Sequence, residues 1–241
     1  MGLCFSYANA SETGHPHWTY EGEHGPEHWG KMSEEFKACG EGKQQSPIDI
    51  SGAENLDLPD IEFNYKPTQL NILNNGHTVQ VVYDKGSSIK VDGQDYQLVQ
   101  FHFHTPSEHT IGGKSFGNEI HLVHKNDKGE LAVVGVLIEK GNENPAFNEI
   151  WANLPQKADE KKEVKVTVNA ESLLPATRSF YRYSGSLTTP PCSESVKWIV
   201  LKTPVPMSEA QINRIQAIMK HNNRPVQPLN ERKVTVDTAT H

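Results

Sequence analysis

The chain has 241 residues, a formal net charge of −7 at pH 7 and a pI of about 5.9. Its length fits one domain that is large enough to bury a substantial core. The acidic balance argues against nucleic acid as a partner, because such proteins carry basic patches, and no apolar run approaches the roughly 20 residues of a membrane span. Twelve histidines are a high count, so their spacing has to show which of them matter.

Residues 1–10 differ in composition from the rest of the chain. They carry no charge and end in Ala-Asn-Ala, the kind of small residues that close a secretory signal peptide. A basic start and a full apolar segment are missing, so we interpret residues 1–10 as a signal-peptide remnant or an added leader. The first six residues also fit the N-myristoylation pattern. Residues 11–241 are expected to form a single domain.

The expected elements after this leader are mostly strands. Residues 11–47 are rich in Gly, His, Pro and Glu, which indicates an irregular wrap with short helical turns. Asp92-Gly93 and the segment 126–129 each separate two β-branched runs and predict hairpins. The runs that indicate strands are residues 78–84, 88–91, 96–104, 119–125, 131–139, 164–168 and 196–202.

Only two segments indicate helices. Residues 145–154 begin with a proline, which is favoured in the first helical turn. Residues 208–220 begin with a serine cap and carry apolar residues at helical spacing. The sequence therefore predicts a mainly β (α+β) fold, a single domain with a large antiparallel sheet and a few surface helices.

One predicted strand places two histidines on the same face. Side chains alternate along a strand, so Gln100, His102 and His104 point one way. Phe101 and Phe103 point the other way, toward a core. A histidine pair at this spacing, joined by one residue from a neighbouring strand, can converge on a single metal ion.

A second predicted strand supplies that third residue. Glu119, His121 and Val123 share one face, and His124 lies on the other. Three imidazoles leave a fourth tetrahedral position for water, as catalytic zinc sites do. Copper, nickel and iron also accept imidazole, so the ligand type alone leaves the metal open.

Polar residues on the two ligand faces strengthen the zinc interpretation. Gln100 and Glu119 lie where acceptors would hold the ring N–H groups and fix the tautomer. A single histidine is more often a hydrogen-bonded core residue than a ligand, and we assign His109 and His124 to that structural class. A competing pattern is that of a cupin-type oxygenase or isomerase, in which Glu108 would also touch the metal. The later segment that cupins need is missing.

Together with several distant segments, the two strands resemble the α-class carbonic anhydrases, particularly the exported bacterial enzymes. The similarity runs from about Trp18 to Val234. The matching segments are GPEHW at 25–29, QSPIDI at 45–50, NNGH at 74–77, QFHFH at 100–104, SEHT at 107–110, EIHLVH at 119–124, YSGSLTTPPCSE at 183–194 and NNRPVQPLN at 222–230. Their shared order along the chain makes the resemblance highly specific.

The resemblance implies a central twisted, mostly antiparallel sheet of about ten strands, with zinc at the base of a cone-shaped cleft. It implies the reversible hydration of CO2 to bicarbonate and a proton by zinc-bound hydroxide, with a secondary esterase activity. The expected partners are CO2, bicarbonate, water, anionic and sulfonamide-type inhibitors, and a second copy of the chain in a homodimer. Neither nucleic acid nor a membrane span is expected.

The resemblance also implies roles for residues around the metal. The residues that match the zinc ligands are His102, His104 and His121. The residues that match the hydrogen-bond partners of those ligands are Gln100, Glu119 and, through its backbone, Asn222. Thr188 matches the threonine that accepts a hydrogen bond from the hydroxide, and Glu108 matches the carboxylate that accepts the proton of this threonine.

Further matches line the cleft. The apolar wall that holds CO2 is matched by Val123, Val133, Leu187, Val196 and Trp198. The backbone N–H of Thr188, with Thr189 beside it, would meet a developing bicarbonate oxygen. His77 matches the proton shuttle, since an ordinary histidine pKa of about 6.5 suits transfer at neutral pH. The polar residues that match the water chain between metal and shuttle are Tyr20, Asn75 and Gln80, the last of which replaces the asparagine common in animal enzymes.

Cys39 and Cys192 match the disulfide of exported members, which would tether the wrap to the loop carrying Leu187 and Thr188. A disulfide fits an oxidising compartment, so the expected location is periplasmic or secreted. A third interpretation is a non-enzymatic relative that serves in binding. Such relatives lose zinc histidines, whereas this chain keeps all three together with Thr188 and Glu108.

Overall fold

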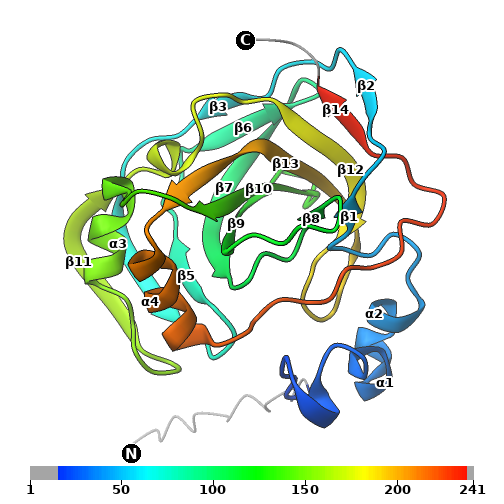
Figure 1. Cartoon of the computed structure of the whole chain (residues 1–241), viewed down its shortest axis with the longest axis horizontal. Coiled ribbons are helices and arrows are strands. Elements are labelled where there is room, and N and C mark those ends of the chain that lie inside the picture. Colours follow the sequence, from blue (N-terminus) through cyan, green and yellow to red (C-terminus); the bar gives the residue numbers. More distant parts are fainter. Residues whose placement is uncertain (1–15, 238–241) are drawn as a thin grey trace, which may run out of the picture.

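The computed structural model describes residues 16–237, and the leader at 1–10 with Cys4 lies outside this range. Twelve strands form one mixed sheet (Figure 1). The strands are β2 (Glu54–Leu56), β3 (Glu62–Asn64), β4 (Thr68–Asn74), β5 (Val79–Val82), β6 (Ser88–Val91), β7 (Gln94–His104), β9 (Asn118–Lys125), β10 (Leu131–Lys140), β11 (Lys161–Val168), β12 (Phe180–Ser186), β13 (Glu194–Met207) and β14 (Thr235–Asp237). Their main path runs β11-β4-β5-β7-β9-β10-β13-β12-β14-β2, with β3 and β6 paired beside it.

Most neighbouring strands are antiparallel, as expected. Within the described part of the sheet, the parallel pairs are β10–β13 and β14–β2. The main path contains about ten strands, as expected. The two further strands lie beside it, because β6 pairs with β7 and β3 pairs with β6. A separate parallel pair joins β1 (Asp49–Ile50) to β8 (Thr110–Ile111).

The helices are short and lie outside the sheet. They are η1 (Gly22–His24), α1 (Trp29–Met32), η2 (Glu34–Phe36), α2 (Ala38–Glu41), η3 (Pro145–Phe147), α3 (Asn148–Ala152), η4 (Ala170–Leu173) and α4 (Glu209–Met219), where η marks a 3-10 helix. The first four form the expected N-terminal wrap, and Figure 1 shows α1 and α2 at one edge, apart from α3 and α4. Ser208 caps α4 as predicted, because its Oγ accepts a hydrogen bond from Gln211 N at 3.2 Å. Within residues 16–237, no helix has the length and apolar character to cross a membrane.

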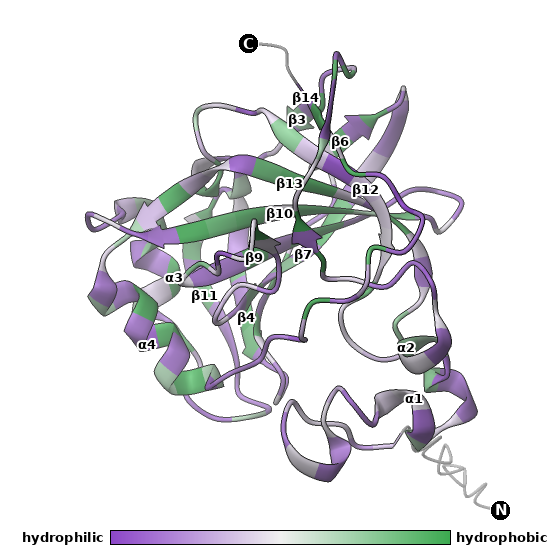
Figure 2. Cartoon of the chain, turned by 45° about the vertical axis from the view of Figure 1, so that its right-hand side comes forward, coloured by the Kyte–Doolittle hydropathy of each residue, from purple (hydrophilic) through white to green (hydrophobic). Residues whose placement is uncertain are grey.

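Apolar residues cover both faces of the sheet. A large cluster includes residues of α3 and α4 and contains Phe101 and Phe103, which are fully buried. A smaller cluster on the histidine-bearing face contains Val133, Val196 and Trp198. Figure 2 shows hydrophobic residues along β10 and β13 and mostly hydrophilic residues in the surrounding loops. The alternation predicted for residues 100–104 is therefore confirmed, with the phenylalanines in the large cluster and the histidines on the opposite face. A register shift between Leu98 and Gln100 ends this alternation, so Leu98 lies in the same cluster as Phe101.

Seven of the fourteen described strands are not predicted from the sequence: β1, β2, β3, β4, β8, β12 and β14. β12 contains no β-branched residue, and its Gly185 is required by the packing, because a Cβ there would collide with Ser46 Oγ and with the ring of Trp198. Such packing against residues distant in the sequence overrides local strand propensity. The helix predicted at 145–154 divides into η3 and α3.

Candidate metal centre

Strands β7 and β9 bring the three predicted ligands together. The antiparallel register pairs His102 directly with His121, and His104 follows two residues later on the same face. One ring nitrogen from each histidine lies within 4.8 Å of the others. His104 and His121 are buried and His102 is half-buried, so one side of the cluster stays accessible.

Each ring is fixed through its other nitrogen. The hydrogen bonds join His102 Nδ1 to Gln100 Oε1 at 2.8 Å, His104 Nδ1 to the Asn222 carbonyl at 2.7 Å and His121 Nε2 to Glu119 Oε1 at 2.9 Å. The nitrogens left to face one another are Nε2 of His102, Nε2 of His104 and Nδ1 of His121. Nε2 of His104 is buried and has no hydrogen-bond partner among the described residues. An orphaned buried nitrogen of this kind fits a ring that is oriented to hold a metal.

Burial keeps these imidazoles neutral. It lowers the pKa of His102 well below the ordinary value and the pKa of His104 to about 4. It also lowers the pKa of His121. Neutral imidazole is the form that binds a metal, and zinc takes such nitrogen donors in tetrahedral sites. The residues present therefore fit a zinc ion.

Glu119 connects His121 to the neighbouring segment that contains Glu108 and His109. Besides His121, its carboxylate accepts hydrogen bonds from the backbone N–H groups of Glu108 and His109 at 2.9 and 2.8 Å and from His109 Nδ1 at 2.7 Å. Burial alone would raise the pKa of Glu119, but His109 and His121 lower it well below its usual value. His109 Nε2 accepts a hydrogen bond from the Tyr183 hydroxyl at 2.7 Å. His109 is thus a hydrogen-bonded structural histidine, as the sequence indicates.

Glu108 is buried beside the histidines, with 2% of its surface exposed. Its Oε1 accepts the Arg224 backbone N–H at 2.7 Å. Burial raises the pKa of Glu108 to about 7, although His121, the Arg224 amide and the Thr188 hydroxyl lower it. Oε2 has no partner at hydrogen-bond distance among the described residues, so the Thr188 contact is a loose one. The carboxylate of Glu108 is not among the ligand atoms that converge with the ring nitrogens of His102, His104 and His121. This argues against the cupin-type arrangement, in which Glu108 would touch the metal.

The apolar residues that were expected to hold the substrate converge on one core cluster. Its buried members include Val133, Val196 and Trp198, and the partly exposed residues that pack against it include Val123 and Leu187. Trp198 also contacts the ring of His121, with centroids 4.8 Å apart. Its Nε1 donates to the Ser186 carbonyl at 2.9 Å. An apolar wall therefore lies directly beside the histidine cluster.

His77 lies on the turn between β4 and β5. Asn75 shapes this turn, because its Oδ1 accepts the N–H groups of His77 and Thr78 at 3.0 and 2.9 Å. The His77 imidazole stacks on Trp18, with ring centroids 3.7 Å apart. His77, Trp18 and His221 line a cavity of about 380 Å³. The residue that matches the shuttle is therefore half-buried against the N-terminal wrap.

The two other residues expected along the water chain lie near the site. Gln80 on β5 pairs directly with His102 on β7, so both side chains point to the same face. The Tyr20 hydroxyl is buried and has no hydrogen-bond partner within residues 16–237. Burial and the nearby charge of Glu108 raise the pKa of Tyr20, which places this wrap residue close to the centre.

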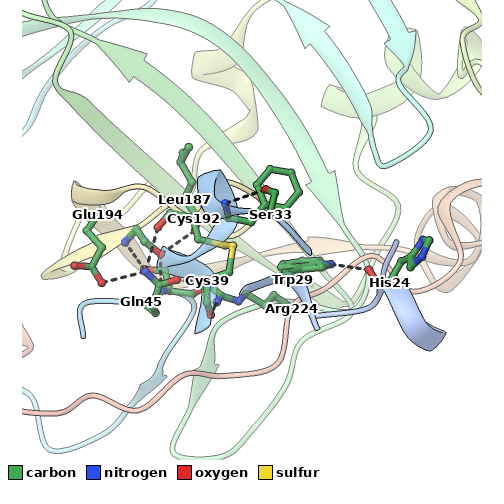
Figure 3. The surroundings of a disulfide bond; sticks show 12 residues. His24, Trp29, Ser33, Cys39, Gln45, Leu187, Cys192, Glu194 and Arg224 are labelled. Atoms are coloured by element: carbon green, nitrogen blue, oxygen red, sulfur yellow. Dashed lines mark hydrogen bonds between the residues drawn. A yellow bond between two sulfur atoms is a disulfide. The ribbon is translucent and has the colours of Figure 1, made fainter. Parts of the chain in front are cut away.

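Cys39 and Cys192 are bonded to each other, as the resemblance implies (Figure 3). The bridge ties α2 to the loop between β12 and β13. Cys192 N donates to the Thr189 carbonyl at 2.9 Å, so the bridge constrains the residue that follows Thr188. A disulfide is compatible with an extracellular location.

Two residues near the site have no role in the sequence interpretation. Trp18 supports His77, and its only sequence signal is an aromatic residue in a polar wrap. Arg224 is 1% exposed, whereas arginine is almost never fully buried unless paired, so its residue type predicts the opposite. The one available signal for Arg224 is its place in the matched segment NNRPVQPLN at 222–230.

Comparison with known proteins gives a consistent result. The family model of the eukaryotic-type carbonic anhydrases matches residues 24–238. A carbonic anhydrase from Klebsiella pneumoniae is 47% identical over 221 residues, which cover 90% of each chain. The α-carbonic anhydrase from Thermovibrio ammonificans, solved with the inhibitor sulfanilamide, has a TM-score of 0.90 at 47% identity and covers 92% of this chain and 100% of its own. A hyperthermostable carbonic anhydrase from a hydrothermal vent chimney has a TM-score of 0.89 at 49% identity, with the same coverage of 92% and 100%. By sequence and by fold, the chain belongs to the eukaryotic-type, or α-class, carbonic anhydrase family, whose enzymes depend on zinc and hydrate CO2.

Proposed function

We propose that the chain catalyses the reversible hydration of CO2 to bicarbonate and a proton, with one zinc ion held by His102, His104 and His121. The observation that carries the proposal is the set of three ring nitrogens within 4.8 Å of one another, each ring being anchored through its other nitrogen. Zinc in such a site lowers the pKa of a bound water to about 7, and carbonic anhydrase is itself the established example of this effect.

Thr188 and Glu108 would orient the attacking group. Glu108 would accept a hydrogen bond from the Thr188 hydroxyl, which leaves the Thr188 oxygen to accept a hydrogen bond from the nucleophile. The backbone N–H of Thr188, with Thr189 beside it, would donate to the CO2 oxygen that gains charge. Thr188 is 5% exposed, so these interactions are sheltered from bulk water and are stronger for that reason.

The apolar wall would hold the substrate. CO2 is linear and nonpolar and offers little to hydrogen-bond, so contact area has to hold it. Val123 and Leu187 form the partly exposed side of this wall, and the buried residues Val133, Val196 and Trp198 support it. The sulfanilamide complex of the Thermovibrio relative supports the expectation that sulfonamides and small anions inhibit this chain. A secondary esterase activity would use the same nucleophile.

His77 would carry the surplus proton to the buffer, with Tyr20, Asn75 and Gln80 along the water chain. Burial lowers the pKa of His77 below its ordinary value, which favours release of the proton to solvent. His77 lies half-buried against the wrap and lines the cavity of about 380 Å³ together with Trp18 and His221, which supports a role in passing protons toward solvent. This role concerns regeneration of the site rather than the attack on CO2.

Stopped-flow measurement of CO2 hydration, with and without a chelator, tests the proposed function. We expect activity that follows the zinc content, at one ion per chain, and that a sulfonamide inhibits. A zinc-loaded chain that does not hydrate CO2 would contradict the proposal and favour a non-enzymatic binding role. We also propose a periplasmic or secreted location, because disulfides persist in oxidising compartments. Cell fractionation tests this location.

A further inference from the structure

A series of hydrogen bonds leaves Glu108 and returns to the loop of its threonine partner. Glu108 Oε1 accepts from Arg224 N at 2.7 Å, and Arg224 Nη1 donates to Gln45 Oε1 at 2.8 Å. Gln45 Nε2 donates to the Cys192 carbonyl at 3.1 Å. Cys192 N donates to the Thr189 carbonyl at 2.9 Å, one residue beyond the threonine that Glu108 faces. Glu108 and the loop that carries Thr188 are thus connected by a second path, which runs through Arg224, Gln45 and Cys192.

The disulfide runs parallel to this connection. Arg224 Nη2 donates to the Cys39 carbonyl at 2.8 Å, and Cys39 is bonded to Cys192. Arg224 therefore reaches Cys192 by two routes, one through the Gln45 side chain and one through the covalent bridge (Figure 3). We name the set of Arg224, Gln45, Cys39 and Cys192 the loop clamp.

The loop clamp is buried, with 1% of Arg224, 3% of Gln45 and 0% of Cys192 exposed. The hydrogen bonds of the guanidinium go to neutral oxygens, including the Ser46 carbonyl at 2.8 Å, and the group lies over the ring of Trp29 at 5.7 Å. Burying a charge is costly, and apolar side chains of similar volume often fill such a space with equal or greater stability. Filling space alone therefore does not account for an arginine at this position.

We propose that Arg224 and Gln45 are positioning residues that, together with the disulfide, set the separation of Glu108 and Thr188. This inference rests on the proposed function, in which those two residues orient the nucleophile. The two routes run in parallel, so opening either one leaves the other in place. Opening both removes the connections between Arg224 and Cys192, so Thr188 can shift relative to Glu108 although Ser186 still holds the start of the loop through Ser46.

Four proteins test the loop clamp: the parent chain, Cys39→Ser/Cys192→Ser, Gln45→Leu and the combination of all three substitutions. Gln44→Leu is the matched control, because it makes the same change at an exposed neighbouring residue. Each route opened alone should lower kcat/KM for CO2 hydration by no more than about threefold. The combined variant should lose about tenfold beyond the product of the two separate effects, as contacting residues in one network do.

A second readout separates positioning from general destabilisation. In a Thr188→Ala background the orienting hydroxyl is gone, so the extra loss of kcat/KM should disappear although the same clamp substitutions are present. Persistence of the extra loss in that background would overturn the inference. In the protein that keeps Thr188, the combined loss of kcat/KM should exceed the product of the two separate losses. A combined loss equal to that product would overturn the inference as well.

Failure of the proposed function has a different signature. A zinc-loaded parent chain that does not hydrate CO2 refutes that function. The loop clamp is then tested by the unfolding temperatures of the same four proteins without zinc. Because each route compensates for loss of the other, the unfolding temperature of the combined variant should fall by more than the sum of the separate decreases. Additive decreases would overturn the loop clamp.

Discussion

The imidazole of His77 stacks on the indole of Trp18, with ring centroids 3.7 Å apart and ring planes inclined by 8°. Trp18 in turn packs edge-on against Tyr20 at 5.3 Å and against Trp29 at 5.1 Å. Burial lowers the pKa of His77, and the neighbouring His17 lowers it further. The N-terminal wrap therefore sets both the place and the proton affinity of the residue that we propose as the shuttle.

Replacement of His77 by alanine should slow turnover by slowing proton export. We expect kcat in weak buffer to fall by roughly tenfold to 100-fold, the upper figure being the lower end of what a positioned proton-transfer group contributes. The value of kcat/KM should stay near that of the parent, because the proposed role of His77 begins after bicarbonate has formed. Small imidazole buffers should restore part of kcat by carrying protons themselves. Stopped-flow rates over a series of buffer concentrations provide the measurement.

Thr188→Ala is the control for that experiment. It removes the hydroxyl proposed to orient the nucleophile, so kcat/KM itself should fall and buffer should not restore it. An unchanged kcat of the His77 variant in weak buffer would contradict the division of roles. Equal rescue of the Thr188 variant by imidazole would contradict it too.

Trp18→Leu should raise the pKa of His77. Loss of the indole exposes the imidazole to water, which favours the charged form and moves the pKa back toward about 6.5. Trp18→Phe keeps an aromatic face and should retain most of the lowered value. NMR titration of the His77 ring in the three proteins provides the measurement. An unchanged pKa in the leucine variant would show that the stacked indole is not the source of the burial.

Alternation along two strands was enough to predict which three histidines come together, the cluster that could hold a metal ion. Gln100, His102 and His104 share a face because the side-chain period of a strand is two, and the same rule places Glu119 beside His121. Only the register between the strands had to come from the structure. Local turn chemistry likewise predicted the two hairpins, since Asp-Gly and the segment 126–129 determine the connection of adjacent strands.

Contacts between distant segments could not be predicted in this way. Arg224 and Gln45 lie 179 residues apart, and no local pattern encodes such a hydrogen bond. Composition also left the partner of Cys39 open, and only the family resemblance paired it with Cys192. The strand β12 depends on packing that a glycine permits, whereas local propensity favours a turn at glycine. Long-range packing is therefore the part of the fold that the residue pattern leaves undetermined.

His121→Ala should abolish tight zinc binding. Two ligands are too few to hold the ion in a catalytic geometry, so the loss of affinity should exceed the roughly 10–100-fold that removing a hydrogen-bond partner of a ligand costs. His28→Ala is the matched control, because His28 is exposed and lies outside the cluster. Elemental analysis of the purified proteins measures the zinc content. Stoichiometric zinc with parent activity in the His121 variant would refute the ligand assignment.

His124→Gln should make the fold less sensitive to acid. His124 is fully buried, its Nε2 bonds with the Tyr65 hydroxyl at 2.8 Å, and burial lowers its pKa to about 3. In the unfolded chain a histidine titrates near pH 6.5. The unfolded state therefore takes up a proton first, and the free energy of unfolding falls as the pH drops from about 6.5 toward 3.

Between about pH 6.5 and 5, this one histidine should remove roughly 2 kcal/mol of unfolding free energy. Glutamine keeps polar atoms for Tyr65 and for the Ala132 carbonyl but does not titrate. Urea unfolding of the zinc-free proteins at pH 7 and pH 5 should thus show a smaller difference for the variant. Identical pH dependence in parent and variant would exclude His124 as a source of acid sensitivity.

The Cys39–Cys192 bridge spans a sequence separation of 153 residues, so its loss frees a long stretch of the unfolded chain. Cys39→Ser/Cys192→Ser should lower the free energy of unfolding by up to about 4–5 kcal/mol, the upper figure of the chain-entropy model for a loop of this size. A reductant should produce the same decrease in the parent and none in the double variant, which serves as the internal control. Chemical unfolding measures the decrease, and peptide mapping without reduction checks the pairing. Free thiols at both positions in oxidatively purified protein would contradict the pairing and remove the main support for an exported location.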